Sequence, residues 1–67
     1  MIDARGRSCP EPVIMIKKAI ESGDREYEML VDNRVALENV TRFANHAGYE
    51  VKVTEQGDDF LLNITKK

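Results

Sequence analysis

Cysteine is scarce in this sequence, with a single copy, Cys9, among 67 residues. One cysteine excludes a disulfide within the chain and any zinc or iron–sulfur site built from several of its own thiolates, so we expect no metal and no other cofactor. No apolar run approaches the roughly 20 residues that cross a bilayer, and the first residues lack the apolar centre of a secretion signal. We therefore expect a cytoplasmic protein with no membrane partner, in a compartment that keeps Cys9 reduced.

An excess of positive charge is also missing. Ten Lys and Arg residues stand against twelve Asp and Glu residues, which gives a net charge of −2. Proteins that bind the phosphate backbone usually carry a basic face, so no direct DNA binding is expected, and no Gly-rich phosphate loop indicates a nucleotide site. The apolar fraction of 42% is enough for one small core. We expect a single domain over residues 1–67.

Two segments place apolar residues at helical spacing, and four alternate apolar with polar residues. In chain order, the patterns predict a strand at 2–5, a helix that starts at Pro10 and ends before Gly23, a strand at 26–31, a helix at 33–47, and a hairpin of strands at 49–54 and 60–65 around a turn at 56–58. Each strand has one apolar face and each helix one apolar stripe. An α/β two-layer sandwich of order βαβαββ buries them all, with a four-stranded mixed sheet, both helices on one face and polar residues on the other.

The candidate site is Cys9, at the junction of the first strand and the first helix. A lone cysteine is most often a small buried residue, but Pro10 and Pro12 follow it directly and stiffen the helix start beneath the sulfur. The composite Cys-Pro-x-Pro is therefore a stronger signal for a working thiol than the cysteine alone. Two N-caps remain open: Cys9, with Pro10 as the first helical residue, or Ser8, with Glu11 completing a capping box.

The chemical surroundings predict moderate activation of the Cys9 thiol. A helix N-terminus and the nearby cations Arg5 and Arg7 favour the thiolate, whereas Glu11 adds a negative charge and the prolines remove N–H donors. Since the sequence has no second cysteine, a sulfur atom held on Cys9 would have to leave to a partner.

Residues 3–13 read Asp-Ala-Arg-Gly-Arg-Ser-Cys-Pro-Glu-Pro-Val and resemble the signature of the TusA/SirA family of small sulfur carriers. The resemblance covers essentially the whole chain, with support from residues 31–44 and 48–49, and it is greatest to the N-terminal domain of YedF-type proteins. It implies a two-layer α/β sandwich in which Cys9 accepts sulfur as a persulfide from a cysteine desulfurase. A downstream acceptor protein would then receive the sulfur, for example toward tRNA thiolation.

The same resemblance assigns roles to the neighbours of Cys9. Motif residues expected to support the site are Gly6, Pro10, Glu11 and Pro12, and residues that could dock a partner are Arg5, Arg7, Lys17, Asp32, Asn33 and Arg34. Asp32 and Asn33 also fit as helix caps, which is the commoner role of such residues. Arg7 departs from the family pattern, where an apolar residue is usual, and so alters the surface beside the sulfur. His46, the single histidine, is assigned no catalysis.

Three functions remain open from the sequence. The first is a sulfur carrier that acts between enzymes and is not itself a free-standing enzyme. The second is a protein- or RNA-binding regulatory module in which Cys9 is incidental, and the third is a redox sensor that cycles through sulfenic acid. YedF-type proteins usually continue into a DsrE-like domain and are associated with selenium metabolism. By resemblance, the chain is either a freestanding carrier or the N-terminal part of a longer protein with a DsrE-like partner domain.

Overall fold

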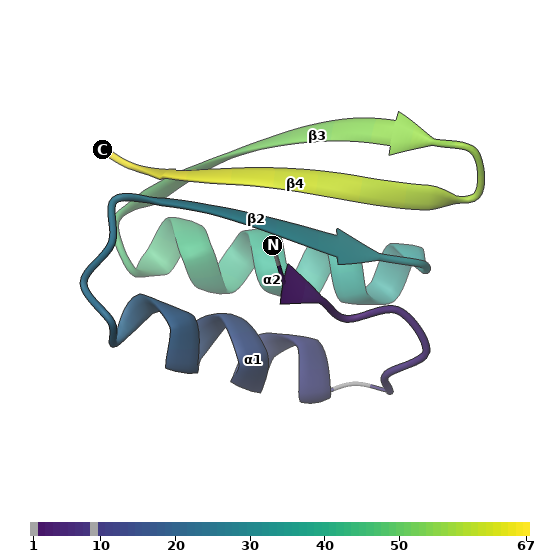
Figure 1. Cartoon of the computed structure of the whole chain (residues 1–67), viewed down its shortest axis with the longest axis horizontal. Helices are drawn as coiled ribbons and strands as arrows, with labels where there is room; N and C mark the ends of the chain where they lie inside the picture. The colour runs from purple at the N-terminus through teal and green to yellow at the C-terminus, as the bar shows by residue number, and fades with distance from the viewer. Residues whose placement is uncertain (1, 9) are drawn as a thin grey trace.

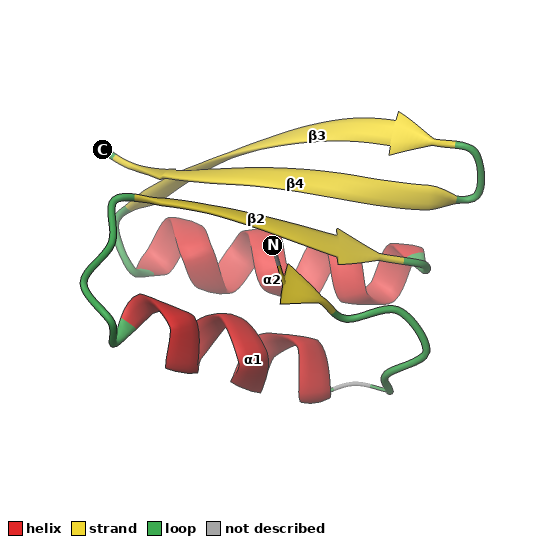
Figure 2. Ribbon diagram, viewed as in Figure 1, coloured by secondary structure: helices red, strands yellow, loops and turns green. Residues whose placement is uncertain are grey.

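The computed structural model describes residues 2–8 and 10–67, and its secondary structure follows the predicted order (Figures 1 and 2). The elements are β1 (Ile2–Asp3), α1 (Glu11–Ile20), β2 (Glu26–Val31), α2 (Arg34–His46), β3 (Tyr49–Gln56) and β4 (Asp59–Lys66). The four strands form one sheet in the order β1-β2-β4-β3, and the two helices form the second layer. The predicted βαβαββ sandwich with a mixed sheet is confirmed.

The directions of the strands decide where the loops meet. β1 is parallel to β2, whereas β4 is antiparallel to both β2 and β3. Because parallel strands end at the same side of a sheet, the chain leaves β1 and β2 at one end of the molecule, where α1 and α2 begin (Figure 1). The β3–β4 turn lies at that end too.

The core fills the space between the two layers. Its largest fully buried side chains come from both helices and the central strands: Ile16, Met29, Val31, Val40, Leu62 and Ile64. Met29 and Leu62 are direct partners across β2 and β4, so alternate residues of these strands face the helices together. Glu26 and Glu28 point to the opposite face and are exposed. This confirms the prediction of a polar open face.

The closing hairpin has a tighter turn than predicted. Gln56 still pairs with Asp59, so the loop contains only Gly57 and Asp58. Gly57 has a φ of +63°, the left-handed region that two-residue hairpin loops require at their first position. The turn is therefore built around this glycine.

Two predicted boundaries at the N-terminus are wrong. The first strand ends at Asp3 and not at residue 5, because the backbone N–H of Arg5 donates to the Asp3 carboxylate (3.1 Å) and the chain turns there. The N-cap position of α1 is occupied by Pro10, and no side chain caps this helix. The Ser8–Glu11 capping box does not form among the described residues, and the alternative cap, Cys9, lies outside them. The Glu11 N–H donates to the main-chain carbonyl of Ser8 (2.8 Å), so a turn of backbone takes the place of a side-chain cap.

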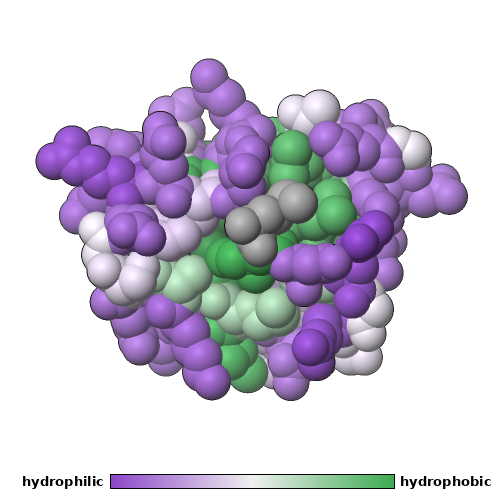
Figure 3. Space-filling view, in the orientation of Figure 1, coloured by the Kyte–Doolittle hydropathy of each residue, from purple (hydrophilic) through white to green (hydrophobic). Residues whose placement is uncertain are grey.

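The short first strand leaves part of the apolar core visible from outside. In the orientation of Figure 1, apolar residues gather at the centre of the surface, between the sheet and α1, and polar residues surround them (Figure 3). Ile2 of β1, Tyr27 of β2 and Ile20 of α1 are half-buried side chains that pack against the core. Two residues of β1 are too few to cover the whole edge of β2.

Helix α1 offers a matched test of the packing. Ile16 is fully buried, whereas Ile14, two residues earlier, is 42% exposed. We predict that Ile16→Ala lowers the free energy of unfolding by about 2–5 kcal/mol, because it removes buried methyl groups and leaves a cavity. Ile14→Ala should cost less than about 1 kcal/mol. Urea unfolding followed by circular dichroism measures both, and equal losses would contradict this description of the core. If Ile16→Ala does not fold, Ile16→Val should cost about 0.5–1.5 kcal/mol.

Candidate functional site

The loop after β1 leads into the Cys-Pro-x-Pro motif and is hydrogen-bonded to the sheet at its start. The Ala4 N–H donates to the carbonyl of Leu30 in β2 (2.8 Å), which extends the parallel ladder by one bond. The Arg7 N–H then donates back to the Ala4 carbonyl (3.3 Å), and between them Gly6 has a φ of +76°. A side chain at Gly6 would strain this backbone, so glycine is favoured here for its conformation.

Asp32 holds the same loop from the other side. Its carboxylate accepts a hydrogen bond from the Gly6 N–H (2.8 Å) and another from the Asn33 side-chain amide (3.1 Å). These two hydrogen bonds lower the pKa of Asp32 below its ordinary value, and the bond from the Gly6 N–H has the larger effect. Asn33 caps α2, because its side-chain oxygen accepts from the Ala36 N–H (2.8 Å). The predicted capping role is therefore confirmed for Asn33 and wrong for Asp32, which joins the loop after β1 to the start of α2.

Arg5 joins the loop to the far side of β2. Its guanidinium donates to both carboxylate oxygens of Asp3 (3.0 Å each) and to Asp59 at the start of β4 (3.3 Å). These contacts raise the pKa of Arg5, chiefly through the Asp3 hydrogen bond, and the same bond lowers the pKa of Asp3. Asp3 and Leu30 are register partners, so the Arg5 bridge crosses the open face beside Leu30. Leu30 itself is only 8% exposed, although it lies on the face that no helix covers.

The start of α1 supplies a firm base for the motif. Pro12 is fully buried, while Ser8, Pro10 and Glu11 are exposed on either side of the motif cysteine. Glu11 lies in the first turn of the helix, where a carboxylate is favoured by the helix dipole. Cys9 itself lies outside the described residues. The segment that carries it is therefore anchored by Gly6 on one side and by Pro12 on the other.

The other predicted docking residues are not all near this loop. Arg34 begins α2 and places its guanidinium carbon 5.7 Å from the centre of the Phe60 ring, a cation–π distance. Arg7 is exposed within the loop. Lys17 is exposed too, but it lies in the last turn of α1, away from the motif. The structure thus brings together Arg5, Arg7 and the start of α2, and places Lys17 apart from them.

An open groove of about 610 Å³ runs between the two helices and starts at the motif. It is lined by Pro10, Val13, Asn39, Arg42, Phe43 and His46. Val13 and Phe43 are half-buried and give it an apolar floor, and Arg42 is an exposed cation at its rim. The groove therefore combines an apolar surface with a positive charge next to the residue that follows Cys9.

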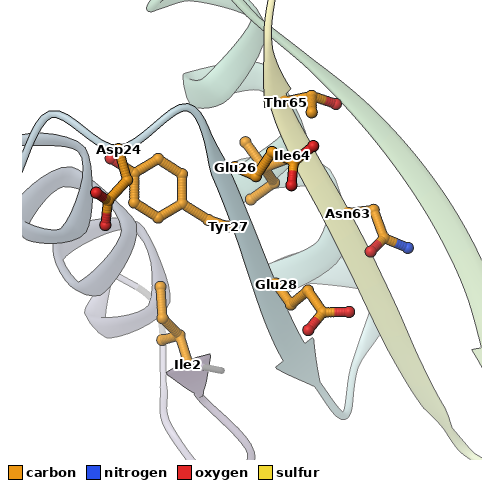
Figure 4. Close-up of a pocket in the computed structure, with 8 residues that line it drawn as sticks. All are labelled: Ile2, Asp24, Glu26, Tyr27, Glu28, Asn63, Ile64 and Thr65. Carbon is orange, nitrogen blue, oxygen red and sulfur yellow. The ribbon is translucent and has the colours of Figure 1, made fainter.

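A second hollow, of about 460 Å³, lies at the other end of β2 and has a different character (Figure 4). Its walls come from β2 and β4 with Ile2 of β1, and its ionisable groups are the carboxyls of Asp24, Glu26 and Glu28 and the Tyr27 phenol. Such a surface repels phosphates and other anions. In the part of the chain covered by residues 2–8 and 10–67, no group of three or more His, Cys, Asp or Glu residues is placed to hold a metal ion.

Sequence reasoning missed several residues of the site. Asp3 and Asp59 were not singled out, although they fix Arg5, and neither were Val13 and Phe43 in the groove. The parallel pairing expected for a strand-helix-strand unit was a usable signal for Asp32, because it brings the end of the second strand next to the loop after the first. Asp59 carried no such signal, since its position depends on the order of strands in the sheet.

Comparisons with known proteins agree with this arrangement. A crystal structure of a SirA-like protein from Desulfitobacterium hafniense superimposes with a TM-score of 0.84 and 35% sequence identity, covering 96% of this chain and 92% of that one. A Methanocaldococcus jannaschii protein, described as the proposed sulfur carrier protein MJ0990, is 38% identical over 68 residues, covering 98% of this chain and 91% of the relative. The family model for sulfurtransferase TusA matches residues 1–66. The chain belongs to the TusA/SirA family.

Neither α1 nor α2 is long and apolar enough to cross a bilayer.

The contact between Asp32 and Gly6 yields a prediction with a pH dependence. Since the pKa of Asp32 in the folded protein lies below its ordinary value of 3.8, its contribution is present above that pH and is lost as the pH falls through the lowered value. We predict that Asp32→Ala lowers the protection factor of the Gly6 amide at neutral pH, and that protonation of Asp32 in acid lowers the same protection factor in the wild type, each taken relative to the intrinsic exchange rate at that pH. NMR-detected exchange measures both.

Asp58→Ala, in the β3–β4 turn, is the matched control and should leave the Gly6 amide unchanged. Equal protection of that amide in the wild type and in Asp32→Ala would show that Asp32 does not hold the loop.

Proposed function

We propose that this protein is a sulfur carrier that holds a persulfide on Cys9 and passes the sulfur between partner proteins. The observation that carries the proposal is the match to the TusA family over residues 1–66, together with the motif Cys9-Pro10-Glu11-Pro12 within it. The M. jannaschii relative described as a proposed sulfur carrier supports the same role. A carrier needs a reachable nucleophilic sulfur and little other chemistry, which suits a chain of this size.

The geometry around the motif is compatible with this role. Gly6 is bonded to Asp32 and Pro12 is buried, so the residues that flank Cys9 are held to both layers of the sandwich. Ser8 and Pro10 are exposed, which keeps the neighbourhood open to a partner. The Arg5 charge is compensated by two carboxylates, so we assign Arg5 a role in holding the loop. Arg7 and the helix N-terminus are the features left to stabilise a thiolate.

The proposed reaction is an exchange of thiol partners. The Cys9 thiolate attacks the terminal sulfur of a donor persulfide, a new S–S bond forms, and the donor S–S bond breaks with its electron pair on the donor thiolate. An acceptor thiolate then attacks the terminal sulfur on Cys9, and Cys9 leaves as a thiolate. No oxidant or reductant is consumed. Because the sequence has a single cysteine, the second step requires a partner.

We propose a cysteine desulfurase as the donor and a separate sulfur-acceptor protein as the recipient, in the cytoplasm, with residues 1–67 acting as one carrier domain. A DsrE-like domain is a proposed acceptor by resemblance to YedF-type proteins, and tRNA thiolation and selenium metabolism are proposed pathways on the same ground. An RNA-binding module fits the structure less well. The open face of the sheet carries Glu26, Glu28 and Glu50 beside a single Lys52, and this balance repels a phosphate backbone.

The groove between α1 and α2 is our proposed docking surface for these partners. Its apolar floor of Val13 and Phe43 fits an apolar side chain, and Arg42 at its rim fits a carboxylate. We therefore propose that a partner inserts an apolar residue flanked by an acidic one, which brings its reactive cysteine to Pro10 and the adjoining Cys9.

The mass of the intact protein tests the carrier chemistry, because a persulfide adds one sulfur atom. We predict that the purified protein, incubated with a cysteine desulfurase and free cysteine, gains one sulfur atom that a thiol reductant removes. Cys9→Ser should gain none, because the nucleophile is gone while the size of the side chain is kept. Intact-mass spectrometry before and after reduction records the result.

A relocated thiol provides the control for position. In the double variant Ser8→Cys with Cys9→Ser, an exposed thiol is present one residue earlier, and we expect it to be sulfurated much more slowly. A wild-type protein that alkylates readily at Cys9 but takes up no sulfur from several desulfurases would refute the carrier role and favour the binding-module hypothesis.

The docking surface predicts a separate effect on rate. Arg42→Glu reverses the charge at the groove rim and should slow sulfur transfer from the desulfurase by about tenfold, which corresponds to about 1.4 kcal/mol of lost interaction. Arg25→Glu makes the same change in the exposed loop between α1 and β2 and should leave the rate unchanged. Initial rates of persulfide formation compare the two. Equal slowing in both would indicate a general electrostatic effect and would refute docking in the groove.

A further inference from the structure

Strand β3 has a free edge whose main-chain groups are ready to pair. It is the outermost strand of the sheet, and within residues 2–8 and 10–67 its ladder partner is β4. Lys67 donates its N–H to the carbonyl of Gly48 (3.1 Å), and the ladder places these two residues opposite each other. Because the groups of an antiparallel strand alternate in direction, the N–H and C=O of Tyr49, Val51 and Val53 face away from β4.

The side chains along this edge are complementary to themselves. Glu50 and Lys52 are exposed neighbours on the open face, on either side of Val51. If a second copy of β3 pairs antiparallel with the first and Val51 lies on the two-fold axis, each Glu50 is opposite Lys52 of the other copy. The same register places the exposed Val53 opposite Tyr49, on the face that carries the helices.

We propose that the partner of this edge is a second copy of the chain, paired about Val51 to form a continuous eight-stranded sheet. Three residue pairs, Val51 with Val51 and Tyr49 with Val53 twice, would each exchange two main-chain hydrogen bonds. Two Glu50–Lys52 ion pairs fix the register. Helix α2 packs against β3 and β4 in each copy, so all four helices lie on one side of the joined sheet.

Charge disfavours the registers whose two-fold axis lies at Lys52, Glu50 or Val53. A two-fold axis at Lys52 puts Lys52 opposite its own copy, and an axis at Glu50 does the same with two carboxylates. An axis at Val53 places Glu50 opposite Gln56 and Lys52 opposite Thr54, which leaves both charges without a counterion in the partner. An axis at Val51 places Glu50 and Lys52 each opposite a residue of opposite charge in the other copy.

The opposite edge of the sheet does not favour a second copy. Among the described residues, β1 pairs with Met29 and Leu30 of β2, and none pairs with the start of β2 on that side. Self-pairing there about Tyr27 would place Glu26 opposite Glu28 twice, and directly opposed like charges destabilise a sheet. Charge therefore selects β3, at the far side of the sheet from the motif loop, as the self-pairing edge. The loop after β1 would remain open to partners in both copies, and the dimer does not depend on the proposed sulfur chemistry.

Reversing the charge of Lys52 or of Glu50 tests the proposal. We predict that the wild type dimerises reversibly at concentrations up to about 1 mM in low salt, since a short edge interface is weak, and that it dissociates as salt is raised. Lys52→Glu and Glu50→Lys should each weaken the dimer by about tenfold or more, because each places like charges opposite each other at two positions. An equimolar mixture of the two variants should dimerise again, since Lys residues of one chain then face Glu residues of the other. Sedimentation velocity measures all four samples, and circular dichroism confirms that each variant is folded.

Restored dimerisation in the mixture, with neither variant dimerising alone, would establish both the edge and the register. A wild type that stays monomeric at 1 mM in low salt would refute the proposal. So would a dimer that survives both single variants, because that dimer would use another surface.

Discussion

The carboxylate of Asp32 accepts the Gly6 N–H, and this contact joins the loop after β1 to the start of α2. The contact exists because β1 and β2 are parallel neighbours, so both strands deliver their chains to the same end of the sheet. Among the described residues, the loop is also held by the bonds of Ala4 to Leu30 and of Arg7 to Ala4, by the Arg5 ion pairs and by the buried Pro12. This hydrogen bond therefore connects the loop that leads to the motif with the segment between β2, in the sheet, and α2, in the helical layer.

The division of charge around the motif follows from the same geometry. Arg5 lies between Asp3 and Asp59, so a residue that looks in the sequence like a free cation beside the thiol instead spans the end of β2. Arg34 lies over Phe60 and is likewise held by a neighbour. Arg7 in the loop and Arg42 beside the groove are exposed cations, and they change the surface that a docking protein would meet.

The two edge strands of the sheet differ in length and in what they leave exposed. β1 contributes two residues and leaves apolar core surface visible between the sheet and α1 (Figure 3). β3 contributes eight residues and has a long open edge that carries alternating charges. Charged side chains on an edge strand usually prevent association. Here their spacing about Val51 opposes one register and matches another, so the same residues can restrict pairing to one geometry.

The sequence by itself determined the element order, the two-layer sandwich, the polar open face and the motif of Cys9. Alternation, helical spacing and the Cys-Pro-x-Pro motif are all patterns of residues close together in the chain. It offered Asp32 and Asn33 as caps of α2 for the same local reason, and Asn33 is the one that caps the helix. The tertiary structure decided what each charged residue near the motif does. Asp59 is 54 residues from Arg5 and Asp32 is 26 residues from Gly6. Such pairs form only after the strands have been ordered in the sheet, and no local pattern encodes that order.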